Sequence, residues 1–334
     1  MIWQRILGRL ASTLLVIVGV MLISFIITHV VPADPARVAA GLMATEEQVA
    51  ALRHEMGLDR PLYVQFGRFI STLARGDLGK SFVTHRSVVD DLRLYFPATF
   101  ELVLLSTALF IVFGIPLGVV CAVTRRRWLR TLAKVVSIGG LGVPAFWLGL
   151  MLQLVFYAKL GWLPPAGRIA GAAPAGPSGL YLLDALLAGD MRMVGSVLVH
   201  MVLPAITLAV NRFGVTLRLV EVEMKKVLRE DYVRTARAKG LAERVVVYKH
   251  AVRNALIPVV TMTGLQFGWL LGGTVLVETV FSWPGLGQYA VFSITAFDFM
   301  PVIGVTMLMA LFFCLVNLTV DISYVFIDPR IEFR

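Results

Sequence analysis

Residues 100–123 read FELVLLSTALFIVFGIPLGVVCAV and contain a single charged residue, Glu101. A helix needs about 20 apolar residues to cross the hydrocarbon core of a bilayer, and this stretch supplies them without interruption. Backbone groups in lipid must be satisfied within the segment, and a run this long and this uniformly apolar is typical of a helix rather than a barrel strand. The stretch therefore predicts a membrane-spanning helix.

Five further apolar stretches have comparable length. The chain of 334 residues is 58% hydrophobic and 16% charged, whereas soluble domains carry about 25% charged residues. The sequence thus predicts an all-α polytopic membrane protein with six transmembrane helices. Besides 100–123, the expected spans are 10–31, 132–157, 194–211, 256–280 and 302–325. The first follows Arg5 and Arg9 but is longer than the apolar core of a secretory signal, so we expect a retained helix.

Basic residues predict the orientation. The short segment between the second and third spans contains Arg125, Arg126, Arg127 and Arg130, and short loops of this kind stay on the cytoplasmic side. Placing that loop inside puts both termini in the cytoplasm. The same asymmetry accounts for the formal net charge of +10, so the charge does not indicate a nucleic-acid partner.

The spans divide the chain into three parts. Residues 1–31 form the N-terminal tail and first helix, residues 32–99 an extracytoplasmic segment, and residues 100–334 a five-helix core with a cytoplasmic coupling loop at 212–256. In the extracytoplasmic part, Thr45 followed by Glu46 and Glu47 predicts a capped helix. The second outer segment, 159–193, is rich in Pro and Gly, which predicts a loop with helix near Asp184.

The chain shows no catalytic constellation, metal site or cofactor site of its own. Residues 74–81, ARGDLGKS, resemble a phosphate-binding loop, but the first position is Ala and the expected side is extracytoplasmic. His54 and Glu55 lack the second histidine of a zinc-protease motif. We interpret Cys121 and Cys314 as packing residues.

Polar and small residues within the spans suggest two roles. Gly264, Gly268 and Gly272 recur every four residues, which favours close helix packing, and a sliding face beside the transport path is the alternative. Asn317 and Asp321 share one face of the last helix with Tyr324 and Asp328, which favours polar anchoring between helices over a cation site. Weak candidates for the translocation path are Gln153, Asn211 and Gln266.

A charged segment, EDYVRTARAKGLAER at 230–244, separates the fourth and fifth spans. Ala236 and Gly240 lie four apart, so a helix here would present a small-residue face able to enter a groove on a soluble partner. The alternative is a basic loop lying on anionic lipid headgroups. We expect the contact with an ATPase to be made by Asp231, Arg234, Thr235, Ala236, Lys239, Gly240 and Arg244.

This segment resembles the coupling loop of ABC-importer permeases, whose pattern is Glu-Ala-Ala, three residues, Gly, nine residues, Ile-x-Leu-Pro. The sequence YVRTARAKG at 232–240 is most similar to the peptide and nickel branch of that family. Further matches, in order along the chain, are PADP at 32–35, GLDRP at 57–61, GDLG at 76–79, PAT at 97–99, HMVLPA at 200–205, FSWPGLG at 281–287 and DPR at 328–330.

The resemblance implies a type I importer permease in the cytoplasmic membrane of a bacterium or archaeon. It implies a second paralogous permease subunit, two cytoplasmic ATP-binding subunits that carry ATP and Mg, an extracytoplasmic solute-binding protein and surrounding membrane lipid. The implied cargo is di- or oligopeptides, with nickel chelates or glutathione as alternatives. A stand-alone channel or carrier and a membrane enzyme are the competing classes.

Five positions depart from the family pattern. Arg253 stands where the pattern has Pro, which leaves the end of the coupling loop open, and Arg234 and Thr235 replace Glu and Ala. Ala33 stands where Gly is usual, and Glu221 where a basic residue is expected.

Overall fold

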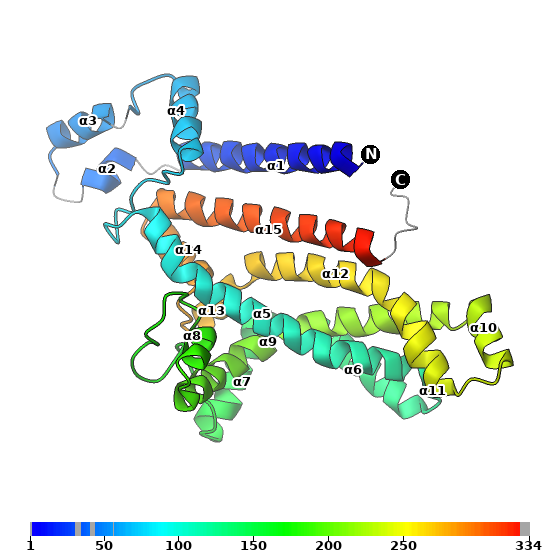
Figure 1. Cartoon of the computed structure of the whole chain (residues 1–334). Helices are drawn as coiled ribbons and strands as arrows, with labels where there is room; N and C mark the ends of the chain where they lie inside the picture. The colour runs from blue at the N-terminus through cyan, green and yellow to red at the C-terminus, as the bar shows by residue number, and fades with distance from the viewer. Residues whose placement is uncertain (1, 31–34, 41–43, 56, 328–334) are drawn as a thin grey trace. The chain divides into compact units, whose positions relative to one another are not determined.

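The computed structural model describes residues 2–30, 35–40, 44–55 and 57–327, with side chains described over most of these ranges. Within them the chain is helical and contains no strand, only an isolated bridge between Lys80 and Ser87. The expected all-α class is therefore confirmed (Figure 1). The chain forms two compact units, here called unit 1 (residues 1–97 and 284–314) and unit 2 (residues 98–283 and 315–334).

Unit 1 holds the N-terminal helices and the region around 284–314. Its elements are α1 (Ile2–Val30), α2 (Pro35–Ala40), α3 (Glu46–Glu55), α4 (Leu62–Ala74), α14 (Leu286–Thr295) and the first turns of α5 (Val88–Val123) and α15 (Phe299–Ile327). Thr45 caps α3 as predicted. Its hydroxyl accepts from the Gln48 amide at 3.3 Å while the Gln48 side chain accepts from the Thr45 amide at 3.0 Å, which is a capping box.

Two buried carboxylates organise the core of unit 1. Asp298 accepts hydrogen bonds from the Ser81 hydroxyl at 2.7 Å and the Phe82 amide at 2.9 Å, so the segment before α5 is held against the turn before α15. Asp91 accepts from the Tyr289 hydroxyl at 2.7 Å. Burial and this bond raise the pKa of Tyr289, which remains a neutral donor.

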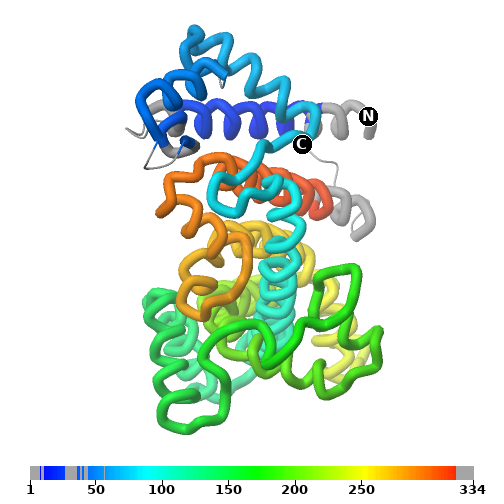
Figure 2. The backbone as a smooth tube through the Cα atoms, turned by 90° about the vertical axis from the view of Figure 1, so that its left-hand side faces the viewer, coloured from blue at the N-terminus to red at the C-terminus, as the bar shows by residue number. Residues whose placement is uncertain are grey.

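Unit 2 is built around the long helix α9 (Met191–Val227), against which α6, α7, α8 and α12 pack. The other elements are α6 (Arg127–Gly142), α7 (Ala145–Leu152), the π-helix η1 (Gln153–Lys159), α8 (Tyr181–Leu187), α10 (Asp231–Ala238), α11 (Glu243–Val245), the π-helix η2 (Val246–Ala251), α12 (Val252–Gly273) and α13 (Val275–Val280). Figure 2 shows the irregular segment after η1, in green, returning to α8 before α9 begins. The loop and the helix near Asp184 agree with the prediction.

Among the described residues, four helices are long and apolar enough to cross a membrane: α5, α9, the continuous stretch Glu243–Gly273 and α15. A fifth candidate is the pair formed by α6 and the helix that runs from Ala145 to Lys159. The apolar part of α1 within the described side chains, Ala11–Ile26, is shorter. The count of six spans and the cytoplasmic termini stay predictions.

The predicted span over 132–157 is not one continuous helix. The two parts of this stretch meet at a bend of 106°. Val143 is extended, with φ −94° and ψ 124°, and Pro144 follows it. The ring of a proline clashes with a helical conformation of the preceding residue, so the first helix ends there and a new one begins with Ala145. The fifth stretch is likewise interrupted, at Thr274 between α12 and α13.

The helix that contains the fourth predicted span, 194–211, is longer than that span. Helix α9 passes Pro204 and continues to Val227, well beyond residue 212, where we expected the coupling loop to begin. Its last turns are amphipathic: Val220, Met224 and Val227 are buried while Val222 and Lys226 are exposed. The polar last turns of α9 are thus stabilised by packing against the rest of unit 2.

Candidate functional site

Helix α10 occupies the centre of the predicted coupling segment. It begins after Glu230 and ends where Gly240 adopts φ +75°, a left-handed conformation that glycine reaches without strain. The Gly240 amide donates to the Arg237 carbonyl at 2.9 Å and the Leu241 amide to the Ala236 carbonyl at 3.4 Å. This is a Schellman motif, so the glycine of the pattern terminates the helix.

One face of α10 is buried in the chain's own core. Val233 is fully buried and Ala236 is 6% exposed, and both belong to a cluster with Met224 of α9, Val246 of η2 and Ala255 of α12. The interpretation that Ala236 lies on an outward small-residue face is therefore wrong. Its small side chain lets α10 lie close to the rest of unit 2, because a methyl group fills little space between the packed helices.

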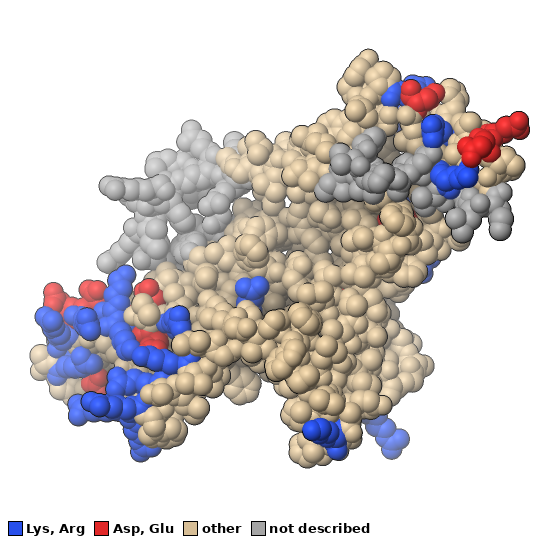
Figure 3. Space-filling model, turned by 180° about the vertical axis from the view of Figure 1, so that it is seen from behind, with Lys and Arg blue, Asp and Glu red and all other residues tan. Residues whose placement is uncertain are grey.

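The opposite face of α10 is exposed and charged. The outward side chains of the predicted contact set are Asp231, Arg234, Thr235, Lys239 and Arg244, and Gly240 is exposed beside them. We call α10, the turn after it and α11 (residues 231–245) the coupling knob. In Figure 3, basic side chains gather at the end of unit 2 that carries this knob, interspersed with a few acidic ones.

Polar bonds fix the knob to the adjoining helices. Arg237 forms a forked ion pair with Glu243, at 2.7 and 3.1 Å, across the turn after α10. Asn254 of α12 donates to the Tyr232 hydroxyl at 2.7 Å. Sequence reasoning missed Tyr232, Arg237 and Asn254, because these partners lie 6 and 22 positions apart and share no helical repeat.

The end of the coupling segment is helical. After α11 the chain passes through η2 and enters α12 with no break at Arg253, which is exposed. Without the proline of the family pattern at this position, nothing prevents the helix from continuing. Glu221, the other departure on this side, forms an ion pair with Lys225 one turn along α9.

The three candidate path residues make hydrogen bonds within unit 2. The Gln153 amide donates to the carbonyls of Pro165 at 2.6 Å and Val280 at 3.1 Å. The Asn211 side chain donates to the Gly140 carbonyl at 3.4 Å. Gln266 is 3% exposed and donates to the Thr216 hydroxyl at 3.2 Å. Each joins two segments of unit 2, and a contact with cargo stays a prediction for all three.

The predicted packing glycines differ from one another. A Cβ on Gly264 would collide with Val320 of α15, so this position requires glycine for the helices to approach. Gly268 is buried, whereas a Cβ on Gly272 would meet no atom within 4 Å. Asn317 is partly buried on α15. The side chains of Asp321, Tyr324, Asp328, Arg5 and Arg9 lie outside those the structure describes, so polar anchoring at this end stays a prediction.

The Arg237–Glu243 pair makes the knob weakly pH-dependent. Hydrogen bonding by Arg237 holds the pKa of Glu243 below its ordinary value. The pair therefore stabilises the knob above the unfolded pKa of Glu243, about 4.3, and this contribution is lost as the pH falls through the lower folded pKa. Since both side chains are largely exposed, we expect no more than about 1 kcal/mol.

This expectation is checked by hydrogen exchange of the α10 amides. Glu243→Gln should speed their exchange by up to about fivefold at neutral pH, and this effect should shrink as the pH falls below the unfolded pKa of Glu243, about 4.3. Glu223→Gln, which removes the same charge from α9 outside the knob, is the control. Equal effects of both variants would show that only net charge matters.

Comparison with known proteins covers almost the whole chain. Residues 114–333 match the family model described as "Binding-protein-dependent transport system inner membrane component", and residues 2–103 match the model of the N-terminal region of the same membrane components.

Several curated relatives align over nearly their full length. The chain is 46% identical to the probable D,D-dipeptide transport system permease protein of Escherichia coli, covering 98% of this chain and 97% of that one. It is 38% identical to the dipeptide transport system permease protein of Alkalihalophilus pseudofirmus, covering 97% and 98%. It is 40% identical to the glutathione transport system permease protein of Pectobacterium atrosepticum, covering 99% and 98%. The chain therefore belongs to the family of binding-protein-dependent transport system inner membrane components and is a permease subunit of an ABC importer.

Proposed function

We propose that this permease forms half of a translocation path for di- and oligopeptides in the cytoplasmic membrane of a bacterium, with a second paralogous permease as the other half. Two cytoplasmic subunits bind and hydrolyse ATP with Mg, and an extracytoplasmic solute-binding protein delivers the cargo. Both termini of the chain lie in the cytoplasm. The observation that carries the proposal is the coupling knob, a charged and exposed helical projection anchored in the core of unit 2.

The anchoring suits the knob to transmit movement. The cluster that contains Val233 and Ala236 of α10 also includes Val119 of α5, Val220 of α9 and Val259 of α12, so the knob shares one buried core with three of the long apolar helices. Close-packed interiors move as rigid bodies rather than deform. When ATP draws the ATPase subunits together, a contact on the exposed face of α10 would therefore shift these helices as a group.

The solutes for which the relatives are named favour a peptide cargo for this permease. D,D-dipeptide, dipeptide and glutathione permeases all handle short peptide-like solutes. We therefore favour this class over nickel chelates. Reconstitution of the complete importer in vesicles tests the choice: unlabelled dipeptides should compete for uptake of a labelled dipeptide, and a nickel chelate should not. Uptake by this chain alone, without ATPase subunits, would contradict the proposal.

A charge reversal on the exposed face of the knob tests the docking role. Arg234→Glu should lower ATP-driven uptake by about five- to tenfold, since a charged contact at an interface is worth roughly 1 kcal/mol or more. Uptake and ATP hydrolysis are measured in vesicles with equal amounts of inserted protein. Arg125→Glu, also exposed and expected on the cytoplasmic side but outside the knob, should leave uptake unchanged. Equal losses in both variants would show that the loop charge, rather than docking, governs activity.

A further inference from the structure

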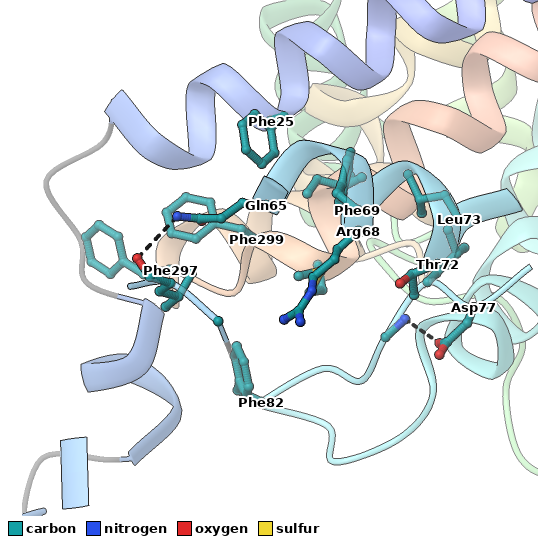
Figure 4. Close-up of a pocket in the computed structure, with 16 residues that line it drawn as sticks. Phe25, Gln65, Arg68, Phe69, Thr72, Leu73, Asp77, Phe82, Phe297 and Phe299 are labelled. Atoms are coloured by element: carbon teal, nitrogen blue, oxygen red, sulfur yellow. Dashed lines mark hydrogen bonds between the residues drawn. The ribbon is translucent and has the colours of Figure 1, made fainter. Parts of the chain in front are cut away.

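Unit 1 contains a cavity of about 250 Å³ whose lining includes several phenyl rings. Figure 4 shows the rings turned toward a common space from α1, α4, the segment before α5 and the start of α15. Phe25 of α1 contacts Phe66 and Phe69 of α4, with ring centroids 5.1 and 5.7 Å apart. The five rings that line the cavity itself are Phe25, Phe69, Phe82, Phe297 and Phe299.

A second cavity adjoins the first, and we call the two together the apolar track. It has a volume of about 160 Å³ and shares Phe299 and Ile303 with the larger one. Its other walls include Val20 of α1 and Thr306 of α15. Both residues fall within predicted membrane spans, so this end of the apolar track lies at the depth of the lipid tails. The two cavities together reach the size of small-molecule sites, roughly 300–1,000 Å³.

The larger cavity also has a charged part. Arg68 of α4 lines the larger cavity, and its guanidinium lies over Gly57, where an added Cβ would come within 2.7 Å of Nη1. Gly57 has φ +69°, so both the backbone and the close approach of Arg68 favour glycine there. Among the residues whose side chains the structure describes, no carboxylate forms an ion pair with Arg68. Asp77 also lines this cavity, and its carboxylate accepts a hydrogen bond from the Gly79 amide at 2.8 Å.

We propose that this track binds one anionic phospholipid, with an acyl chain among the phenyl rings and the phosphate on Arg68. A guanidinium presents several donors to phosphate oxygens and remains charged at all relevant pH values. An aromatic side chain of a soluble partner could reach the rings beside Arg68 but not the end at Val20 and Thr306. A free phosphate would leave the apolar track empty. With the proposed topology the lipid belongs to the extracytoplasmic leaflet, and its binding does not depend on which solute is carried.

Native mass spectrometry of the complete importer in detergent tests the proposal. The probes are phosphatidylglycerol, phosphatidylethanolamine with the same acyl chains, and glycerol phosphate. We expect one phosphatidylglycerol to be retained per complex, about five- to tenfold more tightly than phosphatidylethanolamine. Glycerol phosphate, which lacks acyl chains, should not displace it. Equal retention of the two lipids, or displacement by glycerol phosphate, would overturn the proposal.

Two variants test the phosphate contact and the acyl-chain contact separately. Arg68→Gln should remove the preference for phosphatidylglycerol and leave weak binding of both lipids. Ile303→Trp should fill the junction of the cavities and abolish retention of either lipid. The controls are Arg75→Gln, an exposed arginine just after α4, and Leu15→Trp, an exposed position on α1 that lines neither cavity.

The two control variants also distinguish a loss of lipid binding from a folding defect. Both should retain the lipid as the unmodified chain does, with the same melting temperature. Unchanged selectivity in Arg68→Gln, or unchanged retention in a folded Ile303→Trp, would show that the lipid binds elsewhere. A binding-protein contact would instead be indicated if these variants weakened docking of the solute-binding protein without changing lipid retention, and that result too overturns the proposal. Because lipid retention is read without transport, failure here leaves the peptide-import proposal untouched.

Discussion

Replacing Arg168 by methionine is expected to destabilise unit 2 by about 3–5 kcal/mol, the cost of leaving a buried carboxylate without its partner. The Arg168 guanidinium donates to Glu101 at 2.7 Å, and the side chains are 5% and 6% exposed. The same guanidinium donates to the Gly179 carbonyl at 2.9 Å and lies 3.7 Å from the centroid of the Tyr181 ring. The substitution would remove all three contacts.

The ion pair between Arg168 and Glu101 fixes the 159–193 segment to α5. Glu101, at the start of the apolar run of α5, also accepts a hydrogen bond from the Leu182 amide at 2.6 Å. The Gly167 amide donates to the Phe281 carbonyl at 2.9 Å, which holds the same segment near α13. Loss of Arg168 should therefore release the segment as well as lower stability. We expect a nonspecific protease to cleave the variant around residues 170–178 several-fold faster than the unmodified chain.

A double-mutant cycle separates the interaction energy of the Arg168–Glu101 pair from the contribution of each side chain alone. Arg168→Met and Glu101→Gln should each lower the thermal midpoint of the detergent-purified importer, and the double variant should recover part of the loss because it leaves no unpaired charge. Arg192→Met, an exposed arginine at the start of α9, is the control. Additive losses in the cycle, or a loss no larger than that of the control, would contradict an energetic role for the pair.

Replacing Gly240 by valine is expected to reduce ATP-driven uptake by about tenfold or more while the protein still inserts in the membrane. A Cβ at this position would meet no atom within 4 Å, so the effect is not steric crowding. It comes from the φ of +75°, which costs a β-branched residue at least about 1–2 kcal/mol. The chain can relieve that strain only by changing the turn between α10 and α11. The exposed face of the knob would then turn away from its docking orientation.

The measurement compares uptake with ATP hydrolysis in vesicles that contain the complete importer. We expect hydrolysis to persist while uptake falls, because the ATPase subunits retain their own sites. Gly240→Asn is the matched control, since asparagine tolerates the left-handed region, and it should transport nearly normally. Gly189→Val places the same strain at φ +71° before α9, outside the knob, and should affect stability without uncoupling. Normal uptake by Gly240→Val would refute docking through this turn.

Local patterns in the sequence predicted much of this protein. An unbroken apolar run predicted the long helix through residues 100–123, and Thr45 predicted the start of α3. Gly240 was expected on one helical face with Ala236, but the freedom of glycine at positive φ makes it the end of α10 instead. Each of these features depends on residues within a few positions of one another. Their physical causes, namely hydrophobic length, capping bonds and the freedom of glycine at positive φ, act before any tertiary contact forms.

Tertiary structure decided the rest, because the decisive contacts join distant residues. The outward face of α10 depends on whether Ala236 packs on the chain's own cluster or meets a partner, and only the positions of α9, η2 and α12 settle that it is buried. Glu101 and Arg168 are 67 residues apart, and no repeat in the sequence pairs them. The phenyl rings of the cavity come from four separate segments of unit 1. A sequence determines which stretches become helices, whereas burial and pairing follow from how those helices pack.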